Sequence, residues 1–165
     1  MDTGQSTAVP RRSPPIVSHQ ALDLDQVAEH PDLQTVLTWW RGFGGLPARR
    51  DLTPFVVPPA MLPRVIVIDV QTDPFRAVIT LAGTTIYDEW GMEATGKELR
   101  DVFSPTDYER VRADLLACVD ARTPNFIERR YVGVNQRRVT FRRLMLPLSE
   151  DGQRVSGVFT VSCRV

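Results

Sequence analysis

Residues 64–83, RVIVIDVQTDPFRAVITLAG, contain two apolar runs that are separated by a short polar stretch. The first run is rich in β-branched residues and the second is also extended in character, so both match β-strands. The intervening Thr-Asp-Pro consists of residue types that favour turns. The stretch therefore predicts a β-hairpin, around which a sheet can be built.

The part of the chain after the hairpin predicts helices first and strands last. Ser104 and Pro105 fit the start of a long helix that ends near residue 122. Its expected buried stripe is Tyr108, Val111, Leu115, Cys118 and Val119. Three extended runs follow, at residues 125–134, 137–148 and 155–165. This order predicts an α+β domain with a five-stranded antiparallel sheet and helices packed on one face.

The part of the chain before the hairpin predicts two further segments. Residues 1–20 lack apolar periodicity and are expected to form a disordered tail. Residues 21–62 are expected to contain an N-terminal helix followed by a proline-rich segment that wraps the surface. Residues 63–165 then form the sheet domain. The expected division of the chain is therefore 1–20, 21–62 and 63–165.

The overall composition excludes several classes of protein. The 20 basic and 20 acidic residues balance, so no basic excess points to nucleic acid. The two cysteines lack metal-ligand spacing and do not suggest a disulfide scaffold. No apolar run approaches the length of a membrane span. We therefore expect a cytoplasmic protein that has no metal site, no membrane span and no nucleic-acid partner.

Four stretches of the sequence resemble a known family when they are taken together and in order. They are WWRGFGGLPARRDLTP (39–54), PPAMLPRVIVIDVQTDPFRAVITLAGTTI (58–86), YDEWGMEATGKEL (87–99) and RRLMLPLSEDG (142–152). With the predicted order of strands and helices, they resemble a small subfamily of PAS domains, found largely in alphaproteobacteria and often nearly stand-alone. The resemblance implies a bacterial, non-enzymatic sensory or interaction module that acts on another, unidentified signalling protein.

The sequence departs from the cofactor-binding branches of that family. Flavin-binding PAS domains carry a reactive cysteine in an Asn-Cys-Arg-Phe type of motif, and none occurs in residues 86–103. Haem-binding members commonly use a histidine on or just before the long helix, whereas His19 and His30 both lie far upstream. We therefore expect neither flavin nor a histidine-ligated haem, and the cofactor, if any, stays unknown.

The resemblance also implies where a ligand would lie, namely between the sheet and the central helices. The candidate wall residues are Thr84, Ile86, Trp90, Leu99, Phe103, Leu115, Phe126 and Phe141. Thr84 follows Gly83 and is expected mainly to cap a short helix. Because the other side chains are bulky, we expect them to form a packed core rather than to surround a ligand cavity.

The first helix offers a candidate surface for homodimerisation. Trp39 and Trp40 point about 100° apart on a helix, so both cannot enter one core. Exposed tryptophan is favoured at interfaces. The candidate interface residues are Leu33, Val36, Leu37, Trp39, Trp40 and Phe43.

These features favour a PAS-like regulatory domain that works through protein–protein contact and homodimerisation, and that is gated by a small ligand if one binds. A small-molecule carrier with an aromatic-lined cavity is the alternative. An enzyme is the least favoured class, because no nucleophile or core histidine forms a recognisable catalytic constellation. Along one strand, Arg142 and Arg143 occupy opposite faces, so neither face is expected to be wholly apolar.

Overall fold

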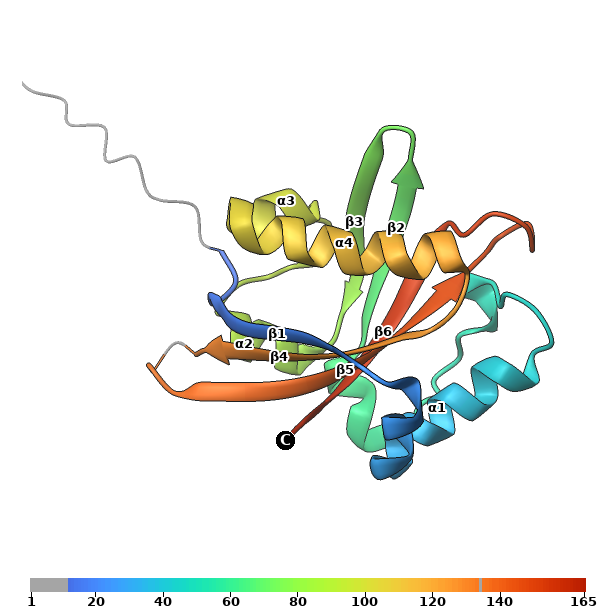
Figure 1. Ribbon diagram of the computed structural model, residues 1–165, viewed down its shortest axis with the longest axis horizontal. Helices are drawn as coiled ribbons and strands as arrows, with labels where there is room; N and C mark the ends of the chain where they lie inside the picture. The colour runs from blue at the N-terminus through green and yellow to red at the C-terminus, as the bar shows by residue number, and fades with distance from the viewer. Residues whose placement is uncertain (1–11, 134) are drawn as a thin grey trace, which may run out of the picture.

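The computed structural model describes residues 12–133 and 135–165, which form one sheet with helices around it (Figure 1). All strand pairs are antiparallel, in the order β1-β4-β5-β6-β2-β3. The strands are β1 (Ile16–Leu22), β2 (Ile66–Thr72), β3 (Phe75–Ala82), β4 (Asn125–Val132), β5 (Arg138–Leu148) and β6 (Gly157–Arg164). The predicted hairpin is confirmed as β2–β3, and the three predicted C-terminal strands are confirmed as β4 to β6.

Strand β1 corrects two expectations, since the sheet has six strands rather than five, and residues 16–20 are not part of a tail. The strand pairs with β4, and its first backbone N–H donates to the Asp107 carboxylate on the long helix at 3.0 Å. Only Ile16 of this strand is buried, so β1 lacks the alternating apolar pattern by which an edge strand is usually recognised. The remainder of the predicted tail, residues 1–11, lies outside the described residues.

The helices form largely where their sequence signals lie. They are α1 (Pro31–Gly42), α2 (Thr84–Trp90), α3 (Leu99–Val102) and α4 (Pro105–Ala121), with short 3-10 helices η1 (Leu24–Glu29), η2 (Arg49–Asp51) and η3 (Pro59–Arg64). The predicted start of α4 is confirmed, because the Ser104 hydroxyl accepts a hydrogen bond from the backbone N–H of Asp107. The cap of α2 is Gly83 rather than Thr84, whose side chain makes no capping hydrogen bond.

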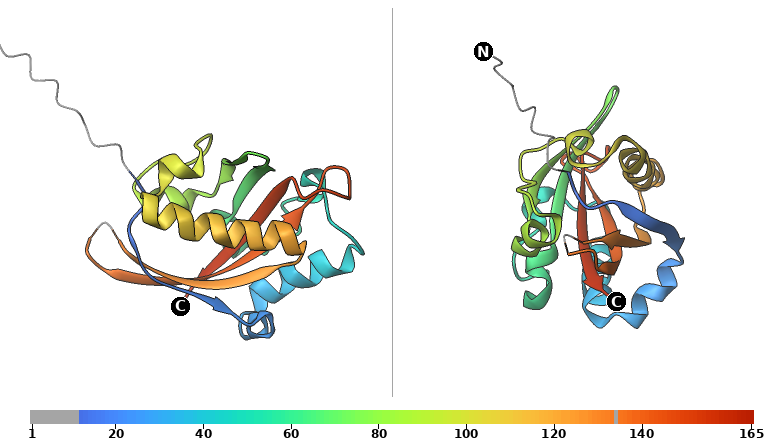
Figure 2. Two further views of the ribbon diagram at one scale, coloured as in Figure 1. Left: turned by 45° about the horizontal axis from the view of Figure 1, so that its top comes forward. Right: turned by 90° about the vertical axis from the view of Figure 1, so that its left-hand side faces the viewer.

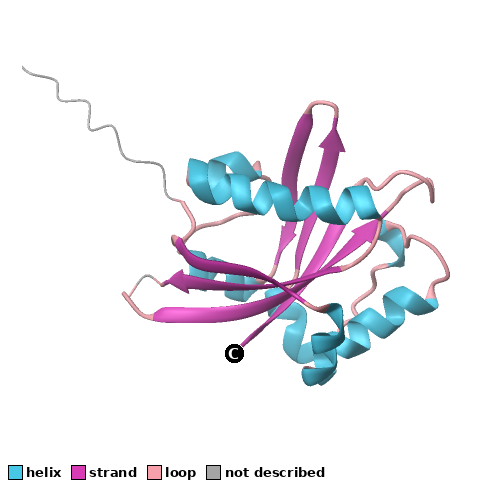
Figure 3. Ribbon diagram, in the orientation of Figure 1, coloured by secondary structure: helices cyan, strands magenta, loops and turns pink. Residues whose placement is uncertain are grey.

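Helices cover both faces of the sheet, which corrects the expectation of one covered face. In Figure 1, α3 and α4 lie above β1, β4 and β5, with α4 crossing in front of the β2–β3 hairpin, and α1 lies below; Figure 3 shows the same arrangement by secondary structure. The side views in Figure 2 show how strongly the β4–β5 hairpin curves between these layers. We call the face that packs against α2, α3 and α4 the inner face, and the one that packs against α1 and η1 the outer face.

The outer face makes residues 21–62 part of the same folded unit as the sheet. Leu33, Val36 and Leu37 of α1 are buried with sheet residues of β5 and β6. The proline-rich segment that follows α1 adds Val57 and Met61 to this cluster. Removal of α1 would therefore expose the apolar outer face of the sheet. The helix is part of the core and not merely appended to it.

Candidate functional site

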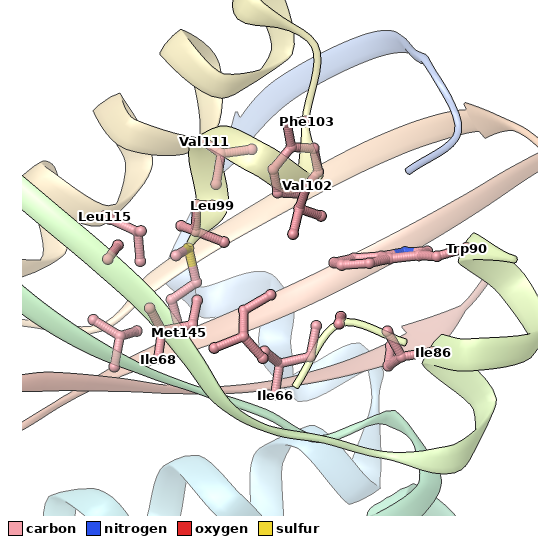
Figure 4. Close-up of a cluster of buried hydrophobic side chains, with 14 of the residues drawn as sticks. Ile66, Ile68, Ile86, Trp90, Leu99, Val102, Phe103, Val111, Leu115 and Met145 are labelled. Atoms are coloured by element: carbon pink, nitrogen blue, oxygen red, sulfur yellow. The ribbon is translucent and has the colours of Figure 1, made fainter. Parts of the chain in front are cut away.

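The inner face carries most of the predicted pocket residues in a close-packed cluster (Figure 4). Ile86 and Trp90 come from α2, Leu99 from α3 and Leu115 from α4, and Phe103 follows α3. The ring of Phe103 meets the indole of Trp90 edge-on, with 5.5 Å between their centroids. Trp90 therefore lies against the cluster as one of its walls.

A small internal cavity remains between this cluster and the sheet. Its volume is about 10 Å³, which leaves room for at most one water molecule. Trp90, Leu99 and Phe103 line it, together with other apolar residues of the inner face. Three polar side chains also reach it from the strands: Arg129, Arg143 and Thr160. We call this space the inner cavity.

A larger pocket opens on the other side of Trp90. Its volume is about 240 Å³, and it lies between α2 and the ends of β4 and β5. Its walls include Trp90, Tyr131, Val139 and Phe141, with Asp88 and Glu89 also among its lining residues. We call it the Trp90 pocket, because Trp90 lines both it and the inner cavity.

One buried arginine of the inner face has its charge balanced. Arg129 is 3% exposed, and its guanidinium lies 2.6 Å from a carboxylate oxygen of Asp114 on α4. His19 on β1 hydrogen-bonds to both partners. Burial opposes ionisation of Asp114, but its hydrogen bond to His19 and the Arg129 charge outweigh burial and lower its pKa. This network ties β1, α4 and β4 together.

The second buried arginine has no such partner. Arg143 is 7% exposed, and within the described residues its Nε has no hydrogen-bond acceptor and its guanidinium forms no ion pair. Burial lowers its pKa, and the neighbouring charge of Arg129 acts in the same direction. The hydroxyl groups of Tyr131 and Thr160 are likewise buried without a partner. Polar groups in such positions normally have partners, so a bound molecule could satisfy this trio.

Two of the predicted pocket residues lie elsewhere. Phe126 is opposite Leu144 on the outer face, because its position in β4 has the other parity from Arg129 and Tyr131. Thr84 is exposed and lines neither the inner cavity nor the Trp90 pocket. The other predicted wall residues do lie on the inner face: Ile86, Trp90, Leu99, Phe103, Leu115 and Phe141.

The predicted interface residues divide in the same way. Leu33, Val36 and Leu37 are fully buried in the chain's own core, so they are not available to a partner. Trp40 also turns inward and donates a hydrogen bond from its indole N–H to the Pro147 carbonyl oxygen. Trp39 packs against Phe43, which is 47% exposed, so these two aromatic rings are what α1 leaves for another molecule.

The candidate pocket predicted from the sequence did not include Arg129, Tyr131, Arg143 or Thr160. The signal was present in part, since Arg143 shares a strand face with Val139, Phe141 and Met145. A charged residue within such an apolar set is either at a solvent edge or buried for a purpose. Arg143 is buried here because α4 packs over this face of β5.

The buried cysteine of α4 and the potential metal ligands do not indicate a further reactive site within the described residues. Burial raises the pKa of the Cys118 thiol to about 12, so it is protonated at neutral pH. No group of three or more potential metal-ligating side chains occurs within the described residues. In that same part of the chain, no helix is both long enough and apolar enough to cross a membrane.

Comparisons with known proteins agree with the geometry. A family model described as a PAS domain matches residues 28–160, which is most of the chain. Among solved structures, a PAS domain of a protein from Colwellia psychrerythraea is similar, with 12% identity and a TM-score of 0.46. The match covers 61% of this chain and 86% of that chain. No curated protein matches. The narrower resemblance to an alphaproteobacterial subfamily stays a prediction. The chain belongs to the PAS domain family, whose members are generally sensory and regulatory signalling modules.

Proposed function

We propose that this PAS domain is a non-enzymatic regulatory module of the bacterial cytoplasm, which works as a homodimer and is gated by a small ligand. The observation that carries the proposal is the Trp90 pocket, a cavity of about 240 Å³ on the inner face beside buried polar groups without partners. A concave pocket lined mainly by aromatic and aliphatic side chains, with a few polar groups, is the usual form of a small-molecule site. Its contents can act on α2 through Trp90.

The arrangement of titratable groups supports a binding role over a catalytic one. His19 and Asp114 are both engaged in holding Arg129, and they do not face the Trp90 pocket. The acids at that pocket are Asp88 and Glu89, and Glu89 is paired with Arg64 at 2.8 Å. A general acid or base needs a perturbed pKa and a reacting group within reach. The residues that line the Trp90 pocket do not supply this pairing.

The carrier hypothesis has less support than the regulatory one. A carrier needs a roomy cavity among the aromatic residues of the inner face, and the space there amounts to about 10 Å³. The Trp90 pocket is larger, at about 240 Å³, and it opens to the surface, so it suits a ligand that binds reversibly and shifts a conformational equilibrium. Such a shift is limited by the difference in ligand affinity between the two states.

The aromatic pair Trp39 and Phe43 supports the proposed assembly. Tryptophan and phenylalanine that stay accessible on a helix are typical anchors of protein interfaces. The pair lies at the C-terminal end of α1, beyond the turn that carries the buried residues. A second copy can therefore cover it without disturbing the outer-face core.

Sedimentation velocity tests the assembly with the double variant Trp39→Ser, Phe43→Ser. We expect the wild-type chain to sediment as a dimer at micromolar concentration and the double variant as a monomer, because serine removes both anchors. Phe55→Ser is the matched control, since Phe55 is 97% exposed and belongs to another segment. A monomeric wild type, or a double variant that still dimerises, would overturn the proposed interface. Deletion of residues 1–46 is unsuitable, because it removes β1 and the buried side of α1.

A further inference from the structure

The charge on Arg143 is the feature of the inner face that most needs an explanation. A guanidinium does not lose its proton in proteins, so Arg143 is a cation at neutral pH despite its burial. A buried charge without a counter-ion is unfavourable, because neither water nor an opposite charge replaces its hydration. A buried arginine is therefore expected either to form an ion pair within the protein or to bind an anionic ligand.

Among the described residues, the charges around Arg143 do not provide that partner. Arg129 and Arg64 are positive neighbours, and Asp114 is already held by Arg129 at 2.6 Å. Glu89 is the acid that opposes their effect, and it is bound to Arg64 at 2.8 Å. Both neighbouring arginines are therefore neutralised, whereas the charge of Arg143 itself has no counter-ion among the described residues and would attract an anion from outside the chain.

The unused donors lie along a path from the Trp90 pocket inward. On β5, Val139 and Phe141 line the Trp90 pocket, and the next residue on the same face is Arg143, which lines the inner cavity. On β4, Tyr131 lines the Trp90 pocket and Arg129 lines the inner cavity. The two spaces are consecutive on the same strand faces, with Trp90 between them. The buried hydroxyl of Tyr131 lies on this path.

We propose that the Trp90 pocket binds a small monocarboxylate with an apolar body, and that its carboxylate pairs with Arg143 and the Tyr131 hydroxyl. This inference rests on the ligand-gated function proposed above and names the class of ligand. The apolar body packs on Trp90, Val139 and Phe141. Arginine suits the head group because its planar fork matches a carboxylate in a bidentate pair.

Two details of the site follow from this arrangement. Asp88 lines the Trp90 pocket on the side of α2, so an anionic head is repelled from it and turned toward Arg143. The inner cavity has room for about one water molecule, so Trp90 must tilt away from the sheet to admit the head group. Since Trp90 is the last residue of α2, ligand binding moves the end of that helix.

Calorimetric titration with phenylacetate and with its neutral analogue phenylacetamide tests the proposal. We expect the wild-type chain to bind phenylacetate about 10- to 100-fold more tightly than the amide, the size of one charge-assisted hydrogen-bonded contact. Arg143→Met should remove this preference, and Arg143→Lys should keep part of it. Arg138→Met is the matched control, because Arg138 lies on the same strand but is exposed. It should leave both affinities unchanged.

Thermal unfolding without any ligand separates a binding role from a structural one. If Arg143 waits for an anion, Arg143→Met is expected to unfold at the same or a higher temperature than wild type, because methionine fills the site without an unpaired charge. Added phenylacetate should raise the wild-type unfolding temperature and leave that of Arg143→Met unchanged. A large drop in the unfolding temperature of Arg143→Met would show a structural role and overturn the proposal.

Other outcomes would overturn the proposal without touching the assembly. If the wild-type chain ignores phenylacetate, or binds the amide equally well, then the assigned ligand class is wrong. The sedimentation result for Trp39 and Phe43 is independent of this titration. A wild-type chain that dimerises but does not bind phenylacetate would therefore contradict the anion site alone. A chain that binds phenylacetate but stays monomeric would contradict the proposed assembly alone.

Discussion

Replacement of Gly83 by alanine is expected to lower the free energy of unfolding by about 3 kcal/mol. Gly83 caps α2 at its junction with β3, and its backbone N–H donates to the Val65 carbonyl oxygen at 2.8 Å. A Cβ at this position would overlap the carbonyl group of Pro63 and stand 2.8 Å from the carbonyl oxygen of Leu62. Both obstacles are backbone, so β3 and η3 must separate to make room.

Gly42→Ala is the matched control for this prediction. Gly42 lies in the last turn of α1, and a Cβ there meets no atom within 4 Å. Alanine is the better helix former, so the control is expected to be neutral or stabilising by up to about 1 kcal/mol. Urea unfolding followed by circular dichroism measures both variants. Equal stabilities for the two variants would contradict the close packing of η3 against the β3–α2 junction.

Replacement of Asp114 by alanine should lower the free energy of unfolding by about 3–5 kcal/mol, because it leaves Arg129 buried and unpaired. The Arg129–Asp114 contact is 2.6 Å, and Arg129 is nearly inaccessible. Loss of the carboxylate also frees His19, which joins β1 to the network. Glu109→Ala is the control, since Glu109 is an exposed acid on the same helix whose pair with Arg112 is long, at 3.5 Å. Exposed pairs of that kind contribute about 0–1 kcal/mol.

The same variant predicts a dependence on pH. The pKa of Asp114 is lowered in the folded chain, so its carboxylate stabilises the fold above the pKa of about 3.9 that aspartate has when unfolded. That stabilisation is lost as the pH falls through the lowered value. Urea unfolding should therefore show a difference between wild type and Asp114→Ala at neutral pH, and a shrinking one below about pH 4. A difference that grows in acid would contradict the assigned charge pair.

The contrast between Arg129 and Arg143 links these stability experiments to function. Both arginines are buried on the inner face, and they sit on adjacent strands. One is held by an acid of the chain, and its partner is needed for stability. The other is paired with no acid in the described part of the chain, and its neutral replacement is expected to be tolerated. A large loss of stability in Asp114→Ala, together with unchanged stability in Arg143→Met, would show that Arg129 is paired for stability and that Arg143 is free to bind a ligand.

Local patterns were sufficient to predict the hairpin and the long helix. The β2–β3 signal lies in contiguous β-branched residues, and the start of α4 is fixed by Ser104 and Pro105. Such signals depend on residues that are neighbours in sequence, so they can be recognised without knowledge of the fold. The β1 strand could not be predicted in this way, because it is held by Asp107 and by pairing to β4, which are distant in sequence.

The candidate site was only partly predictable for a related reason. Ile86, Trp90 and Leu99 were expected between the sheet and the central helices because the resemblance to PAS domains implies it, and they lie on the inner face. The prediction for Phe126 was wrong, because the pairing of β4 with β5 fixes the register of β4 and places Phe126 on the outer face. Arg143 was missed as a site residue because arginine is usually at the surface, and its burial comes from the helices above the sheet.

A crystal structure of the chain with phenylacetate is the sharpest single measurement. We predict density for the ligand in the Trp90 pocket, with its carboxylate at roughly 2.7–3.2 Å from the Arg143 guanidinium and Trp90 displaced from the inner face. The contrary result is an empty Trp90 pocket with Arg143 paired to an acid of the chain itself. That result would leave the PAS fold in place and remove the ligand site from it.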